Sequence, residues 1–314
     1  MRALVVKDVG ASPVVADFAE PDPGPDEIVV EMLAAGVHPI VRMIAAGRHY
    51  GSHAELPFVP GVDGIGRLPD GTVAYVGFAR APWGTLCERT VIPAGWSIPL
   101  PAGADPVVVA ATMNPLAAVW MALVHRAALK SGERLLVLGA TGASGRLAVQ
   151  LAAGMGAGEV VAVGRNPAVL EQLGAAPGVT AVSLSDTDRL AGVLGEQGVD
   201  VVLDYLWGPP AETVIGLLTR TGLTHHATGT RWVQVGEMAG SRMTLDATPL
   251  RSSGLTLLGS GAGSVDPRVV AGAIPELLGM VASGSVAAEL RAVPLADAGT
   301  AWDLEDPRRL VVTF

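Results

Sequence analysis

Three glycines at three-residue spacing, Gly139, Gly142 and Gly145, form a pattern that can bind a phosphate group. They lie between an apolar run, 135–138, and a segment with helical spacing that opens near Ser144. In such a turn the glycines permit a tight bend, close approach of a pyrophosphate and close packing of helix on strand, while the first N–H groups of the helix face the phosphates. The alternative is an ordinary turn in a chain with 40 glycines. The residues expected to contact a dinucleotide here are Gly139, Thr141, Gly142, Ala143, Ser144 and Gly145.

The end of the next apolar run, 160–163, indicates which dinucleotide is bound. A site for NAD usually places Asp or Glu there, about 20 residues beyond the glycine motif, to hold the ribose hydroxyls. Here the run is followed by Gly164, Arg165 and Asn166, and no acid occurs until Glu171. The guanidinium of Arg165 suits a 2′-phosphate and Gly164 leaves room for it, so the sequence predicts NADPH at these three residues. The alternative for Arg165 is a solvated surface side chain.

The elements that position this motif are apolar runs alternating with helical segments from residue 135 onward. Continuous apolar strands between helices are typical of a parallel sheet covered on both faces, with right-handed crossovers, which predicts a doubly wound layout. The expected strands are 135–138, 160–163, 180–184, 199–203, 232–235 and 255–258, and the expected helices are 144–153, 167–173, 188–194 and 211–218.

The first third of the chain has a different rhythm, made of short strands and turns. Strands are expected at 2–6, 27–33, 72–77 and 86–92, around a loop-rich passage at 47–66, and a last strand at 309–314 is placed to rejoin this lobe. The predicted fold class is therefore α/β, with a β-rich domain and a doubly wound parallel-sheet domain.

Composition restricts the classes of function. Half of the 314 residues are hydrophobic and 16% are charged, which predicts a large buried core. A net charge of −9 without any run of Lys and Arg argues against a nucleic-acid partner. The single cysteine, Cys87, excludes an internal disulfide and favours a reducing, cytoplasmic compartment. The most apolar stretch, 107–124, is broken by polar residues and a proline, so a buried helix is expected rather than a membrane span.

Four segments carry a family resemblance: Leu56–Gly66, Gly139–Ala152, Asp200–Gly208 and Gln234–Gly236. Together they resemble the zinc-free quinone-oxidoreductase (zeta-crystallin-like) branch of the medium-chain dehydrogenase/reductase superfamily, and the similarity runs nearly end to end. The resemblance implies a GroES-like catalytic domain from residues 1–112 and 251–314, a Rossmann NADPH-binding domain from 113–250, and an active site in the cleft. It also implies a homodimer formed through the last Rossmann strand, near 255–258.

The resemblance adds four residues to the expected cofactor site. Tyr205 follows the fourth Rossmann strand, and Gln234 and Gly236 belong to the fifth strand and its turn. Asn114 lies at the junction of the domains, where relatives touch the cofactor. Its alternative role is helix capping before Pro115.

The resemblance also shows departures from the zinc-containing relatives. Their catalytic zinc takes a cysteine where this chain has His38 and a histidine where it has Val62. Their structural zinc needs four cysteines, and this chain has one. Catalytic zinc requires three protein ligands, and beside His38 and Asp63 the sequence offers no convincing third. We therefore expect no metal.

Without a metal, reduction of a conjugated acceptor is easier than reduction of an isolated ketone, because the developing charge spreads over the conjugated oxygen. We therefore expect reduction of a quinone or an α,β-unsaturated carbonyl. Tyr50 lies in the loop where this branch often places a tyrosine near the substrate; it would orient the carbonyl or supply a proton, or only pack. His49 is the neighbouring candidate, and the register between the two is open. His38 occupies the position that faces the nicotinamide in relatives, with a structural histidine as the alternative.

Two further functions stay open at this stage. One is an NADPH-dependent ketone or secondary-alcohol dehydrogenase that uses Tyr50 or His38 in place of zinc. The other is a non-catalytic NADPH-binding protein. The sequence does not name the acceptor, because variable loops form the substrate pocket.

Overall fold

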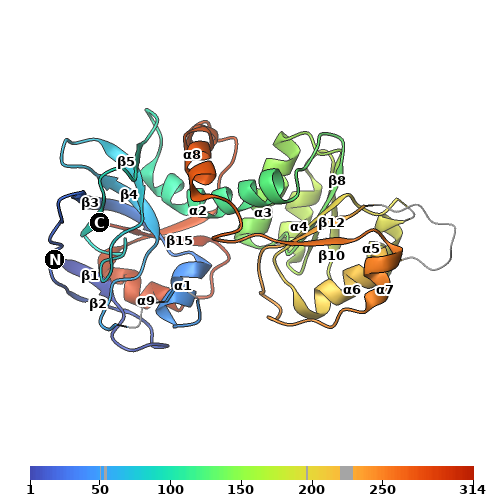
Figure 1. The fold of residues 1–314 in the computed structure, drawn as a ribbon, viewed down its shortest axis with the longest axis horizontal. Helices are drawn as coiled ribbons and strands as arrows, with labels where there is room; N and C mark the ends of the chain where they lie inside the picture. The colour runs from blue at the N-terminus through green and yellow to red at the C-terminus, as the bar shows by residue number, and fades with distance from the viewer. Residues whose placement is uncertain (50, 53–54, 196, 220–228) are drawn as a thin grey trace. The chain divides into compact units, whose positions relative to one another are not determined.

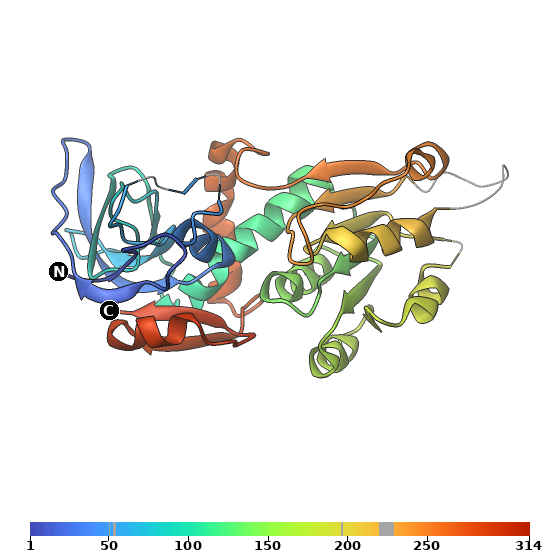
Figure 2. The same cartoon turned by 90° about the horizontal axis from the view of Figure 1, so that it is seen from below.

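The computed structural model describes residues 1–49, 51–52, 55–195, 197–219 and 229–314. The chain divides into two compact units, one made of Met1–Pro115 with Ala273–Phe314 and the other of Leu116–Gly272. The fold is mixed α/β, as predicted: the first unit is the GroES-like β-rich unit and the second contains a parallel Rossmann sheet (Figure 1 and Figure 2).

The β-rich unit contains a seven-stranded mixed sheet and a two-stranded antiparallel sheet, β1-β2. The order in the larger sheet is β14-β15-β3-β4-β5-β7, and β6 also pairs with β3. The expected last strand is present and pairs with β3. The strands are β1 (Arg2–Val5), β2 (Val14–Asp17), β3 (Glu27–Gly36), β4 (Asp63–Arg67), β5 (Val73–Gly77), β6 (Arg89–Pro93), β7 (Ser97–Pro99), β14 (Leu290–Pro294) and β15 (Arg309–Thr313). The short helices are α1 (Pro39–Ala45), η2 (Leu295–Asp297) and α9 (Ala298–Trp302).

Strand β4 lies in the passage that the sequence analysis interpreted as a loop, and its glycines explain the difference. A Cβ at Gly66 would lie 2.2 Å from Val30 Cγ1, and a Cβ at Gly64 would lie 2.7 Å from the Ala34 carbonyl oxygen. The glycines that suggested a loop therefore allow β4 to pack against β3.

The Rossmann unit has six parallel strands in the order β10-β9-β8-β11-β12-β13. Counted from β8, this is the order 3-2-1-4-5-6 of dinucleotide-binding folds. The strands are β8 (Arg134–Leu138), β9 (Glu159–Gly164), β10 (Val179–Ser183), β11 (Val201–Asp204), β12 (Arg231–Gln234) and β13 (Thr256–Gly259). The helices are η1 (Met121–Arg126), α3 (Ala143–Gly154), α4 (Pro167–Gly174), α5 (Thr187–Leu194), α6 (Gly208–Leu218) and α7 (Ala247–Ser252). Every strand and helix predicted for this half is present.

The inner strands of this sheet, β8, β9 and β11, are buried because helices cover both faces. In Figure 1, α3 lies on one side of the sheet and α6 and α7 lie on the other. Leu136, Val161, Val202 and Trp232 are fully buried in one apolar core. β13 belongs to the same sheet, and the unit therefore ends at residue 272 rather than at the expected 250.

Two long helices, α2 (Pro106–Trp120) and α8 (Pro267–Ala282), each contain a boundary between the units. The continuous helical segment Pro106–Arg126 is long and apolar enough to cross a membrane by length and composition. Of its most apolar stretch, 61% is buried inside the protein, which is typical of a core helix.

Two glycines of α3 give a matched test of the packing. A Cβ at Gly145 would lie 2.3 Å from the Gly139 carbonyl oxygen and 2.7 Å from Ala140 Cα, whereas a Cβ at Gly154 meets nothing within 4 Å. We expect Gly145→Ala to lower the free energy of unfolding by about 1–3 kcal/mol, because backbone must move.

Gly154→Ala serves as the control and is expected to raise the free energy of unfolding by up to about 1 kcal/mol, through helix propensity. Urea unfolding of both variants measures the difference. Equal effects at the two positions would contradict the close contact.

Candidate active site

The glycine loop joins β8 to α3 in a tight turn. Gly139 has φ +96°, a conformation that favours glycine. The N–H groups of Gly139 and Ala140 donate to the Val163 carbonyl at 2.9 and 2.8 Å, which fixes the loop to the end of β9. The contact of Gly145 with this turn holds the start of α3 against the end of β8.

The N-terminus of α3 has the features of an anion-binding site. Its N-cap, Gly142, has extended backbone and no side chain to accept from the helix. Arg146 N–H makes the first bond of the helix, to the Gly142 carbonyl at 2.9 Å. The N–H groups of Ala143 and Ser144 precede that bond and have no acceptor inside the helix. A phosphate oxygen is the ligand that such groups and the positive end of the helix dipole favour.

The structure explains why position 164 is a glycine in a different way from the one expected. A Cβ there would lie 2.4 Å from Thr141 Cγ2 and 2.7 Å from Thr141 Oγ1. Gly164 is buried, and the Thr141 side chain occupies the space that was expected to receive a 2′-phosphate. Thr141 therefore packs the glycine loop onto the end of β9.

Arg165 is exposed directly after β9. No hydrogen bond or ion pair joins its guanidinium to the part of the chain that the structure describes, so the group is available for an anion. Asn166 is the N-cap of α4, and its Oδ1 accepts from the N–H groups of Ala168 and Val169 at 3.1 and 3.3 Å. The Asn166 side chain thus has a structural role that the sequence analysis did not foresee.

Tyr205 follows β11, at the point where the strand order reverses between β8 and β11. A Cβ added at Gly139 would lie 3.2 Å from Tyr205 Cβ, so the tyrosine borders the glycine loop. Its hydroxyl is buried and has no hydrogen-bond partner among the described residues, and burial raises its pKa. A buried hydroxyl without a partner is the kind of group that a bound ligand satisfies.

Gln234 and Gly236 lie at the end of β12, beside Tyr205. Gln234 Nε2 donates to the Gly236 carbonyl at 3.0 Å. A Cβ at Gly236 would lie 2.8 Å from the Tyr205 carbonyl oxygen. Tyr205, Gln234 and Gly236 therefore lie close together, as expected for residues at the ends of neighbouring strands. Position 236 must be a glycine because two backbones approach closely there.

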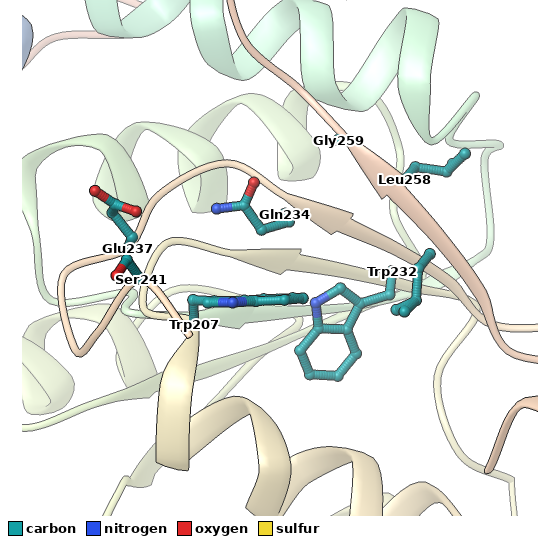
Figure 3. Close-up of a pocket in the computed structure, with 8 residues that line it drawn as sticks. Trp207, Trp232, Gln234, Glu237, Ser241, Leu258 and Gly259 are labelled. Carbon is teal, nitrogen blue, oxygen red and sulfur yellow. The ribbon is translucent and has the colours of Figure 1, made fainter. Parts of the chain in front are cut away.

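A pocket of about 430 Å³ lies along β12 and β13 and beside the turns that follow β11 and β12 (Figure 3). Figure 3 shows the indoles of Trp207 and Trp232 on one side, with Gln234 and Glu237 on the other. Its lining residues are Trp207, Trp232, Gln234, Glu237, Ser241, Leu257, Leu258 and Gly259. Ser260 follows the lining residue Gly259, and its buried hydroxyl has no hydrogen-bond partner within the described residues.

A second pocket, of about 230 Å³, lies between α5 and α6. Its walls are mainly apolar, from Leu184, Thr187, Leu190, Pro209, Pro210, Thr213 and Val214. Apart from Gln234, no residue of either pocket was predicted from the sequence. Trp207 and Ser260 come shortly after parallel strands, and that position is the sequence signal that could have indicated the larger pocket.

Asp204 organises the turn after β11. Its Oδ1 accepts from the N–H groups of Leu206 and Trp207 at 2.8 and 2.9 Å, and its Oδ2 accepts from Trp232 Nε1 at 3.2 Å. The carboxylate is buried, and burial raises its pKa. Three donors compensate for the lost water.

In the β-rich unit, His38 lies in a buried polar cluster. It precedes α1, and its side chain is 1% exposed. His38 Nε2 lies 3.3 Å from Asp63 Oδ1 without hydrogen-bond geometry, and Tyr75 Oη donates to Asp63 Oδ2 at 2.6 Å. A Cβ at Gly36 would lie 2.5 Å from His38 Nε2, so that glycine makes room for the ring. Burial lowers the pKa of His38, although Asp63 opposes the shift.

His49 and Asn114 are the other expected residues of this unit that the structure describes. His49 lies in a separate turn, where its Nδ1 accepts from Gly51 N–H at 3.0 Å. Tyr50 lies outside the described residues. Asn114 lies inside α2 rather than at its start, so the alternative of helix capping is wrong. Among the described residues, no three His, Cys, Asp or Glu side chains gather as metal ligands.

Known proteins are similar to this chain over most or all of its length. No protein-family profile matches it. A probable NADPH-dependent quinone reductase of Emericella nidulans is 26% identical, over 98% of this chain and 97% of that protein. The quinone oxidoreductase of Homo sapiens is 27% identical, over 71% of each chain. The crystal structure of the quinone oxidoreductase from Thermus thermophilus, also solved with NADPH, has a TM-score of 0.80 at 26% identity and covers 100% of both chains.

The two units, the 3-2-1-4-5-6 sheet and these similarities define a medium-chain dehydrogenase/reductase. The similar proteins are named quinone reductases and quinone oxidoreductases, which is the branch that the resemblance predicted.

The buried histidine generates a prediction about pH. Because the pKa of His38 is lowered in the folded protein, the unfolded chain binds more protons below its own pKa of about 6.5. The free energy of unfolding should therefore fall as the pH decreases through this range, with a contribution of up to about 1.4 kcal/mol per pH unit.

His38→Asn keeps a side chain suited to an N-cap but removes the titration. Urea unfolding of both proteins between about pH 5 and pH 8 measures the slopes. We expect a shallower slope in the variant; identical slopes would show that His38 is not held neutral.

Proposed function

We propose that the protein is an NADPH-dependent oxidoreductase that reduces a quinone or an α,β-unsaturated carbonyl without a metal ion. The observation that carries the proposal is the glycine loop, whose uncapped helix follows a turn with no room for a Cβ at Gly145. The exposed guanidinium of Arg165 follows the neighbouring strand. The names of the similar proteins support the same activity, and two of these proteins match this chain over nearly their whole length.

The residues fit the phosphorylated dinucleotide in three places. The N–H groups of Ala143 and Ser144 would hold the pyrophosphate. Arg165 would pair with the 2′-phosphate through charge-assisted hydrogen bonds. The pocket between α5 and α6 has the apolar walls that a flat adenine ring requires.

NADPH, when bound, supplies a hydride. The chain must orient the acceptor and stabilise the charge that develops on its oxygen. In a conjugated acceptor this charge is delocalised, so a hydrogen-bond donor can replace a Lewis acid. Tyr50 and His49 remain candidates for this donor. The neutral ring of His38 is a further candidate, with its structural role beside Asp63 as the alternative.

Three finer statements belong to the proposal. Independence from zinc is supported by the donor set, in which the described residues offer the pair His38 and Asp63 without a third ligand. A homodimer is supported by β13, which is the edge strand of its sheet. A cytoplasmic location is supported by Cys87, a buried free thiol.

Arg165→Glu tests the nucleotide assignment. Removal of the guanidinium and addition of a like charge should cost at least one charge-assisted hydrogen bond, about 1.5–3 kcal/mol. We expect the ratio of kcat/KM for NADPH over NADH to fall by about 10- to 100-fold.

Because the fold does not depend on any contact of the Arg165 guanidinium, the melting temperature should stay near that of the wild type. Gln150, exposed on α3, provides a control in Gln150→Glu, which adds a negative charge on the same unit. An unchanged ratio in Arg165→Glu would remove Arg165 from the cofactor site.

The activity itself is tested with an acceptor panel. NADPH oxidation should be measured with 1,4-benzoquinone, phenanthrenequinone, a medium-chain enone and a simple ketone, before and after treatment with a chelator. We expect turnover of a quinone or the enone and no effect of the chelator. Turnover of the ketone alone would support the dehydrogenase, and tight NADPH binding without any turnover would support a binding protein.

A further inference from the structure

Trp207 has a backbone conformation that glycine adopts more easily. Its φ is +56° and its ψ is −166°, and the following residue, Gly208, has φ +59°. Asp204 Oδ1 accepts from the Trp207 N–H at 2.9 Å and holds this conformation before α6 begins. A glycine at 207 would form the same turn without strain. The turn therefore does not explain the indole.

The indole of Trp207 instead forms a wall of the larger pocket. It lies with the Trp232 indole on one side of the cavity, and the Gln234 amide and the Glu237 carboxylate lie on the other (Figure 3). Trp232 is immobilised by its Nε1 bond to Asp204 Oδ2. One buried carboxylate thus holds the backbone of Trp207 and the indole of Trp232. A flat aromatic wall facing an amide suits a planar ring that carries a polar substituent.

The place of the pocket in the sheet indicates which ring this is. The pocket is formed by β12, β13 and the turns that follow β11 and β12, whereas Arg165 follows β9, on the other side of the β8–β11 switch point. A dinucleotide crosses such a sheet at the switch point, with one half on each side. If Arg165 holds the adenosine phosphate, the nicotinamide half reaches the pocket of Trp207.

We propose that Trp207 is a positioning residue whose indole stacks on the nicotinamide ring. The proposal rests on the proposed function, because it needs the phosphorylated dinucleotide to bind. Trp207, the strained residue of the β11–α6 turn, would then contact the cofactor. Asp204 would position Trp207 through its bond to the Trp207 N–H.

The test compares two ligands and three variants by calorimetry. NADPH contains the nicotinamide, and 2′-phospho-ADP-ribose lacks it. Trp207→Gly removes the indole at a backbone that suits glycine, and Trp207→Phe keeps a flat ring. Phe78→Gly is the matched control, because Phe78 is the exposed aromatic residue at φ +58° in the other unit.

For Trp207→Gly we expect a Kd for NADPH about tenfold higher and a Kd for 2′-phospho-ADP-ribose within about twofold of the wild type. Trp207→Phe should recover most of the NADPH affinity, and Phe78→Gly should change neither Kd. Equal changes for the two ligands, or none, would overturn the stacking contact. Binding of neither ligand by the wild type would instead overturn the proposed function.

A fluorescence measurement keeps the proposal testable if Trp207→Gly does not fold. NADPH should quench the indole emission of the wild type, and Trp207→Phe should lose a large part of that quenching while it binds NADPH with similar affinity. Undiminished quenching in Trp207→Phe would place the nicotinamide away from Trp207.

Discussion

The backbone of α3 meets the backbone of the preceding turn at Gly145, where the space for a single methyl group is missing. This contact sets the distance between the first helix of the Rossmann unit and its first strand. The N-terminus of α3 therefore lies at the carboxyl end of β8, next to the switch point. The first N–H groups of α3 and the ends of the neighbouring strands then lie at one edge of the sheet. The features of that edge that suit an anion follow from backbone packing.

Asp204 makes a comparable contribution further along the same edge. A buried carboxylate is costly unless it is hydrogen-bonded, and here backbone and side-chain donors from two elements surround it. The residue ties the turn after β11 to β12 and fixes the entry into α6. The order of this part of the sheet edge therefore depends on one buried side chain.

The sequence allowed prediction of the Rossmann sheet because its strands are continuous apolar runs. The assignment of Arg165 to the cofactor uses the residue type at a strand end, which is a local signal, and it stays a prediction. It did not reveal β4, since Gly64 and Gly66 resemble loop residues until the packing against β3 is known. Gly164 was assigned to a phosphate, whereas a tertiary contact with Thr141 explains it. Trp207 was missed because a tryptophan is not expected where φ is positive. These misses are all contacts between segments distant in sequence or unusual backbone conformations.

Arg165 has a consequence for how such a protein changes over generations. Its guanidinium has no partner within the described chain, so the fold does not depend on it. Most mutations of a marginally stable protein are limited by the stability that they cost. Mutations at this position escape that limit. If Arg165 selects the cofactor as proposed, the preference between the two nicotinamide dinucleotides can change without a loss of stability.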